Sequence, residues 1–111
     1  METGQIARYR MKLAELEMAA AASVKAARDA GDEHALMLAQ VRLSMLTPNG
    51  MLSVLGCRRE SKCRPVLDHM DEKMRKHQAD GDYDSAERVR LQITMLTEAM
   101  AMYADMEAGD E

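Results

Sequence analysis

The side chains of this chain that are best suited to catalysis or metal binding are its histidines and cysteines. His34, His69 and His77 are the three histidines, and Cys57 and Cys63 are the two cysteines. The cysteine spacing fits neither a CxxC redox pair nor a zinc finger, whose ligands come in close pairs. No Ser/His/Asp order, glycine-rich phosphate loop or HExxH sequence occurs. The sequence therefore predicts neither an enzyme nor a metal or cofactor site, and the cysteines are expected as free thiols or a facultative disulfide.

A second chemical feature is a basic cluster near the middle of the chain. Arg58, Arg59, Lys62 and Arg64 stand there against a single acid, Glu60. Such side chains can contact phosphates, an interaction that is electrostatic and carries no sequence information. However, no aromatic residue is interleaved to stack on bases, and the whole chain has a net charge of −4. A solvated loop that pairs with the acidic C-terminal residues is the favoured interpretation, and nucleic-acid binding by these four residues is the alternative.

The composition indicates that helices position these residues. Among 111 residues there are 12 Met but no Phe or Trp. Strong helix formers dominate, while β-branched and aromatic residues are scarce, so the fold class is expected to be all-α. No apolar run is long enough to span a membrane, and the cysteine usage favours a reducing, cytoplasmic setting. The methionines either fill the core or form an adaptable contact surface.

A repeat with an offset of 50 positions defines the architecture. Segments 30–47 and 80–97 share one pattern, in which a Gly-Asp pair at Gly31 and again at Gly81 precedes an amphipathic stretch. Glycine can end a helix in the left-handed conformation, and the following aspartate can cap the next helix. The repeat therefore predicts two related antiparallel helical hairpins, which form a four-helix bundle or an elongated helical dimer.

The predicted boundaries follow from the breakers in the sequence. The expected units are a first hairpin, a basic connector, a second hairpin and an acidic tail, at 1–47, 48–64, 65–107 and 108–111. Within the connector, residues 51–55 are compatible with a short helical turn and 56–64 with a loop. Pro65 is expected in the first turn of the third long helix, where its missing N–H costs nothing.

The last helix has two apolar faces instead of one. Its main apolar face alternates steps of three and four through Ala86, Val89, Ile93, Leu96, Met100 and Tyr103. At about 100° per residue, a second stripe lies roughly 130° around the helix. That second stripe consists of Leu91, Met95, Met102 and Met106. One hairpin cannot bury both faces, so the other hairpin, a second copy of the chain or a foreign partner is expected to cover the stripe.

The second hairpin also contains a recognisable motif. Residues 70–96 read MDEKMRKHQADGDYDSAERVRLQITML, with an acidic–aromatic–acidic turn at 82–84. The second-helix residues that fit are Ala86, Val89, Arg90, Gln92, Ile93 and Leu96. This segment resembles the UVR motif, a helical hairpin found in a nucleotide-excision-repair helicase subunit, in Clp-type chaperones and in activators of a protein arginine kinase. Glu87 and Leu91 depart from the motif. The resemblance implies protein–protein docking, with Arg90 and Gln92 as contact positions.

Together these features predict a non-catalytic helical interaction module, which is an adaptor, inhibitor or regulator of a larger protein complex. Its partner is expected to be another protein, a second copy of the chain, or both. The expected partner-binding residues are Arg90, Leu91, Gln92, Met95, Met102 and Met106. The alternatives are a small nucleic-acid-associated regulator that uses residues 58–64 and a small virion structural component.

Overall fold

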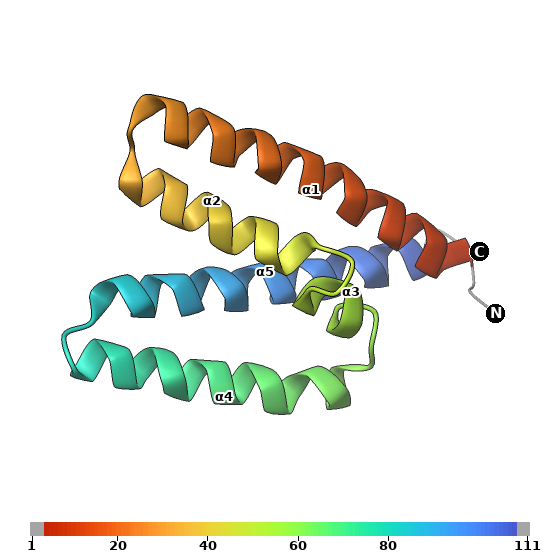
Figure 1. The fold of residues 1–111 in the computed structure, drawn as a ribbon. Coiled ribbons are helices and arrows are strands. Elements are labelled where there is room, and N and C mark those ends of the chain that lie inside the picture. Colours follow the sequence, from red (N-terminus) through yellow and green to blue (C-terminus); the bar gives the residue numbers. More distant parts are fainter. Residues whose placement is uncertain (1–3, 109–111) are drawn as a thin grey trace.

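The structure is a computed structural model that describes residues 4–108. This part of the chain contains five helices (Figure 1). In chain order they are α1 (Gly4–Ala30), α2 (Glu33–Leu46), α3 (Met51–Leu55), α4 (Glu60–Ala79) and α5 (Tyr83–Ala108). Residues 1–3 and most of the predicted acidic tail, 109–111, lie outside the described residues, as do the side chains of 107 and 108. The all-α prediction is confirmed.

The turn between α1 and α2 forms as its Gly-Asp pair predicts. Gly31 has a φ of 70°, in the left-handed region that favours glycine. Its N–H donates to Arg28 O at 3.1 Å, and Asp32 N–H donates to Ala27 O at 3.0 Å. These two bonds define a Schellman C-cap. The Asp32 carboxylate then accepts from Ala35 N–H at 3.0 Å and caps α2.

The turn between α4 and α5 repeats this network bond for bond. Gly81 has a φ of 76°, and the Gly81 and Asp82 N–H groups donate to Gln78 O and His77 O at 3.1 and 2.9 Å. Asp82 Oδ1 accepts from Ser85 N–H at 3.2 Å. Hydrogen bonds from Ser85 hold the pKa of the Asp82 carboxyl below its usual range. The predicted repeat is therefore confirmed down to individual hydrogen bonds.

The two hairpins lie side by side with both turns at one end of the molecule (Figure 1). α1 pairs antiparallel with α2, and α4 pairs antiparallel with α5. α5 is the central helix because it also contacts α1, α2 and α3, whereas α4 makes no comparable contact with another helix in the described part of the chain. The buried core joins both hairpins through Tyr9, Leu13, Ala20, Met45, Leu46, Leu52, Leu67, Met70, Val89, Leu96 and Ala99.

The connector is shorter than predicted, because α4 begins at Glu60. Residues 60–64 are helical, so the prediction of a loop there is wrong, and Pro65 lies inside the helix and not in its first turn. The reason is the burial of Cys63, which is 0% exposed. Its thiol donates to Leu55 O at 3.1 Å and holds this extra helical turn against α3. That anchoring outweighs the backbone hydrogen bond that Pro65 cannot make.

Candidate functional site

The predicted stripe on α5 contributes two methionines to an apolar groove between the hairpins. Met95 and Met102 are half-buried and pack against the core. Both line a hollow of about 330 Å³, which is at the lower end of the range for ligand pockets, about 300–1,000 Å³. Its other walls come from α1, α2 and α3. The groove therefore exists only because the two hairpins dock.

Small residues on α1 keep this groove open. Ala19, Ala20 and Ser23 form the α1 wall opposite the two methionines, together with Leu16, which is 38% exposed. Alanine and serine bring little side-chain volume, so the methionines meet incomplete cover at this level. The result is an apolar surface that a side chain from outside can still reach.

The edge of the groove carries one charge of each sign. Arg42 of α2 and Glu98 of α5 both line the hollow, and both residues are exposed. Leu46 and Leu52, which are buried, contribute to its apolar walls. A ligand that fits this arrangement has an apolar face and at least one charged group beside it.

Leu52 is held in place by the buried tyrosine of α1. The Tyr9 hydroxyl donates to Leu52 O at 2.6 Å. The ring also packs edge-on against Tyr103, with centroids 5.4 Å apart and planes at 81°. Burial, with a smaller contribution from nearby Cys57 and Cys63, raises the pKa of the Tyr9 phenol. Tyr9 thus ties α1, α3 and α5 together behind the groove wall that Leu52 forms, a role that local sequence patterns do not indicate.

The raised pKa of Tyr9 has a consequence for stability in alkali. A phenol whose pKa is higher in the folded state than in the unfolded chain stabilises the fold below its unfolded pKa, near 10. This stability is lost as the pH rises further, at no more than about 1.4 kcal/mol per pH unit. We expect urea unfolding to give a falling free energy of unfolding above about pH 10. Tyr9→Phe should flatten that decline, and equal slopes in the two chains would contradict the assignment.

The remaining predicted partner-binding residues lie elsewhere. Arg90 is exposed and lines a separate hollow of about 240 Å³ with Tyr83 and Glu87. Met106 is half-buried, and its carbonyl accepts from Arg8 Nη2 at 3.2 Å. The half-buried Leu91 and Gln92 do not line the groove. The structure therefore brings together Met95 and Met102 and leaves the other four predicted positions outside the groove.

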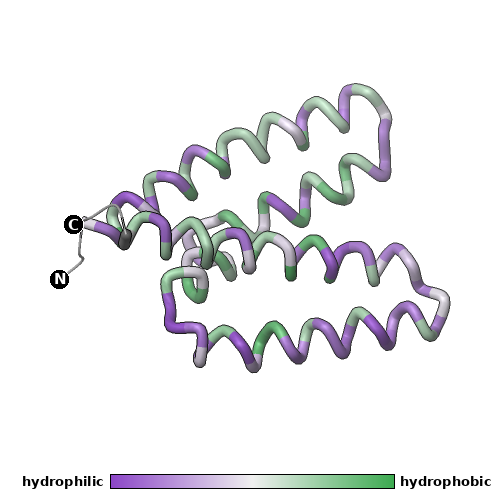
Figure 2. The backbone as a smooth tube through the Cα atoms, turned by 180° about the vertical axis from the view of Figure 1, so that it is seen from behind, coloured by the Kyte–Doolittle hydropathy of each residue, from purple (hydrophilic) through white to green (hydrophobic). Residues whose placement is uncertain are grey.

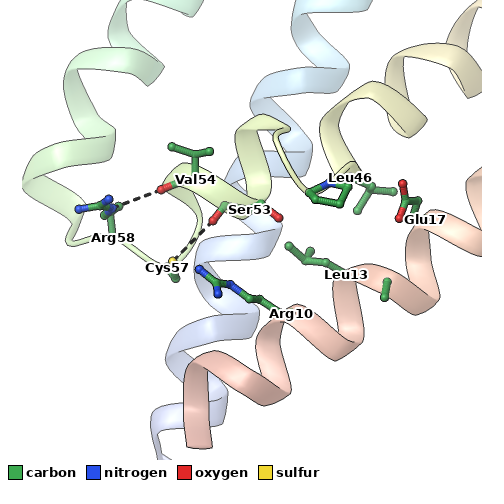
Figure 3. Close-up of a pocket in the computed structure, with 10 residues that line it drawn as sticks. Arg10, Leu13, Glu17, Leu46, Ser53, Val54, Cys57 and Arg58 are labelled. Carbon is green, nitrogen blue, oxygen red and sulfur yellow. Dashed lines mark hydrogen bonds between the residues drawn. The ribbon is translucent and has the colours of Figure 1, made fainter. Parts of the chain in front are cut away.

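The four basic residues of the alternative hypothesis, Arg58, Arg59, Lys62 and Arg64, are all exposed. Arg64 pairs with Glu60 at 2.6 Å within α4, which raises the pKa of its guanidinium. Arg58 Nε donates to Val54 O at 3.3 Å. Figure 3 shows Arg58 beside a hollow of about 460 Å³ into which Arg10 also points. Two of the four residues thus contact the chain itself, Arg58 through the backbone and Arg64 through Glu60.

Both cysteines are free thiols, Cys57 half-buried and Cys63 buried. Burial, more than the neighbouring Cys57 and Glu60, raises the pKa of the Cys63 thiol. Within residues 4–108, no three His, Cys, Asp or Glu side chains gather as a metal site would require. None of the described helices is both long and apolar enough to cross a membrane.

Comparison of the chain with known protein families, with characterised proteins and with solved structures found no match. The groove is therefore interpreted from its own geometry.

Proposed function

We propose that this chain is a non-catalytic helical interaction module, an adaptor, inhibitor or regulator, which binds an amphipathic helix of another protein. The observation that carries the proposal is the apolar groove between α1, α2 and α5, in which Met95 and Met102 stay accessible. Apolar surface that the fold does not cover favours association, because burial removes it from water. The resemblance of residues 70–96 to the UVR motif supports the same class of function.

The size and composition of the groove favour an amphipathic helix as the occupant. A hollow of about 330 Å³ takes a few side chains and not a whole segment. A helix can supply these side chains at positions i, i+3 or i+4 and i+7 from one face while its polar face stays in water. Met95 and Met102 are unbranched and polarizable, so they can repack around such anchors.

Charge selects among amphipathic helices. Arg42 favours a partner with an acidic residue at that edge of its apolar face, and Glu98 favours a basic residue at its own. Such rim charges act mainly on specificity and on the rate of association. The apolar contact supplies the larger share of the affinity.

The experiment places a photo-reactive methionine analogue in the groove of the full chain. Replacement at position 102 should cross-link one other protein in cells of the source organism, whereas replacement at the outward-facing Met18, 75% exposed and outside the groove, should not capture that protein. The cross-linked protein, once purified, is then titrated with the wild-type chain and with variants. Leu16→Glu and Met102→Glu should each weaken binding about tenfold or more, because a charge in an apolar contact is costly.

Two controls make the result decisive. Circular dichroism should show unchanged helicity in both variants, since Leu16 and Met102 are not fully buried. Arg59→Ala with Lys62→Ala should leave the affinity unchanged. If the basic substitutions abolish binding and the groove substitutions do not, the docking proposal is wrong and binding through residues 58–64 is favoured.

A further inference from the structure

The outward face of α1 carries apolar residues that the monomer leaves in water. Ala7, Met11, Ala14, Met18 and Ala21 follow one another at steps of four, three, four and three, and all are exposed. Met11 is 68% and Met18 is 75% exposed. Among the other large apolar side chains of the described residues, only Tyr83, at 71%, is comparably exposed. Alternating steps of three and four are typical of a seam between paired helices.

This seam is separate from the face that α1 buries in its own fold. Tyr9, Leu13, Ala20, Val24 and Ala27 form the buried face. At about 100° per residue, the centre of the seam lies roughly 130° away from it. α1 is also the outermost helix of the first hairpin, and hydrophobic colouring extends through the middle of its length (Figures 1 and 2). α1 thus has two apolar faces, one buried in the core of its own fold and one exposed to solvent.

The charges beside the seam change sign along the helix. Arg8 and Glu15 lie along one edge of the seam, and Arg10 and Glu17 lie along the other. The N-terminal half of each edge is therefore basic and the C-terminal half is acidic. Two such helices placed antiparallel bring opposite charges together on both edges, because the basic half of one lies beside the acidic half of the other.

We propose that a second copy of this chain covers the seam, with α1 packed antiparallel against α1 of the partner subunit. The register follows from side-chain size. Met11 packs opposite the partner subunit's Ala14, and Met18 packs opposite the partner subunit's Ala7. Each long side chain thus meets a short one, which lets the two helices approach closely and interdigitate.

The same register satisfies the edge charges. In an antiparallel helix pair, matching edge positions face each other across the seam. Arg8 then faces the partner subunit's Glu15, and Arg10 faces the partner subunit's Glu17. The two-fold axis produces each pair twice. Packing and charge, which are independent features of the sequence, therefore select one arrangement.

The monomer contacts of Arg8 and Glu15 are compatible with that arrangement. Arg8 Nη2 donates to Met106 O at 3.2 Å, and a guanidinium has five N–H donors to share. Glu15 pairs with Lys12 at 3.4 Å, with the carboxylate side chain 69% exposed. A solvent-exposed pair of this kind contributes little, so a partner arginine can share the carboxylate.

A parallel dimer fits the same face less well. It would stack Met on Met and Ala on Ala along the seam. Of the four edge charges it would pair only Arg10 with the partner subunit's Glu15, because Glu17 would face the partner subunit's Ala22. Glu17 therefore distinguishes the two orientations.

The dimer is tested with the full chain by sedimentation velocity and light scattering. Between about 1 and 300 µM, a range suited to a small interface, the wild type should approach twice the 12.4 kDa mass of the chain. Met11→Glu with Met18→Glu should give a monomer with unchanged helicity, because both side chains point into solvent. A wild-type chain that stays monomeric throughout this range would overturn the proposal.

Charge substitutions test the orientation. Glu17→Lys should weaken the dimer about tenfold, because two attractive pairs become repulsive. Adding Arg10→Glu to Glu17→Lys should restore it, since both pairs regain opposite signs. In a parallel dimer, Glu17→Lys would leave the dimer affinity unchanged and Arg10→Glu would weaken it. Observing these two results would refute the antiparallel arrangement. Glu33→Lys, an exposed acid on α2, is the matched control.

This proposal and the proposed function can fail independently. Leu16 and Met102 lie in the groove and not on the seam, so their substitution should leave the dimer intact. Met11→Glu with Met18→Glu should leave the binding of a partner helix to each groove intact.

Discussion

Leu96→Ala is expected to lower the free energy of unfolding by about 3–4 kcal/mol, within the range for buried leucines. Leu96 is 0% exposed and belongs to the core that joins the two hairpins. It lies on α5, the helix that contacts all the others. Truncation removes the transfer energy of the lost methyl groups and leaves a cavity, which helices held from several sides cannot close.

Urea unfolding followed by circular dichroism measures this effect. A domain of this size has roughly 5–15 kcal/mol of stability in total, so the expected loss is a large fraction. Leu46→Ala should cost a similar amount, because Leu46 holds the equivalent position in the repeat and is 5% exposed. Val54→Ala, at a residue 50% exposed, should cost about 0.5 kcal/mol or less. If Leu96→Ala cost no more than Val54→Ala, the assignment of Leu96 to the joint core would be wrong.

The repeat could be predicted because its turns depend on local backbone chemistry. Glycine at a left-handed position and aspartate at an N-cap depend on neighbours within a few residues. The sequence therefore predicts both Gly-Asp turns, and the structure confirms their hydrogen bonds at Gly31 and Gly81. The offset of 50 also relates Leu13 to Cys63, which are both buried. That correspondence was a readable signal that residues 60–64 continue the helix.

The first turn of α4 could not be predicted from local rules alone. Pro65 favours a helix start, and the charged residues before it favour a loop. The anchor is instead a contact between Cys63 and Leu55 O, which depends on how α3 folds back. The hydrogen bond of Tyr9 was missed for a similar reason, because its acceptor, Leu52 O, lies 43 positions away in the sequence.

The candidate site was predicted on one side only. The stripe on α5 follows from helical periodicity, and Met95 and Met102 do line the groove. The opposite wall depends on how the hairpins dock, which periodicity does not specify. Docking places the small residues of α1 beside these two methionines and leaves Leu91 and Arg90 outside the groove. A surface made by two hairpins is a tertiary property, so one helix can supply only half of it.

Gly56→Ala is expected to destabilise the fold by about 3 kcal/mol, at the upper end of the usual cost of overpacking. A Cβ at Gly56 would overlap the Tyr9 hydroxyl and would lie 2.8 Å from Leu52 O, closer than a carbon can approach either atom without a shift. The backbone is not the cause, because Gly56 has a φ of −59°, which any residue adopts. The matched control is Gly4→Ala, whose Cβ would meet only Arg8 Nη1 at 3.6 Å, and its effect should be about 0.5 kcal/mol or less.

A double-mutant cycle with Tyr9→Phe tests this cause. Alone, Tyr9→Phe should cost about 1–2 kcal/mol, because it removes the hydrogen bond to a buried carbonyl. In the Gly56→Ala chain the same change also removes the atom that the new methyl group meets first, so it should cost less or become stabilising. We expect a coupling of at least about 1 kcal/mol, since residues in direct contact are not additive. Strictly additive losses would mean that the close packing of Gly56 against Tyr9 does not limit what this position accepts.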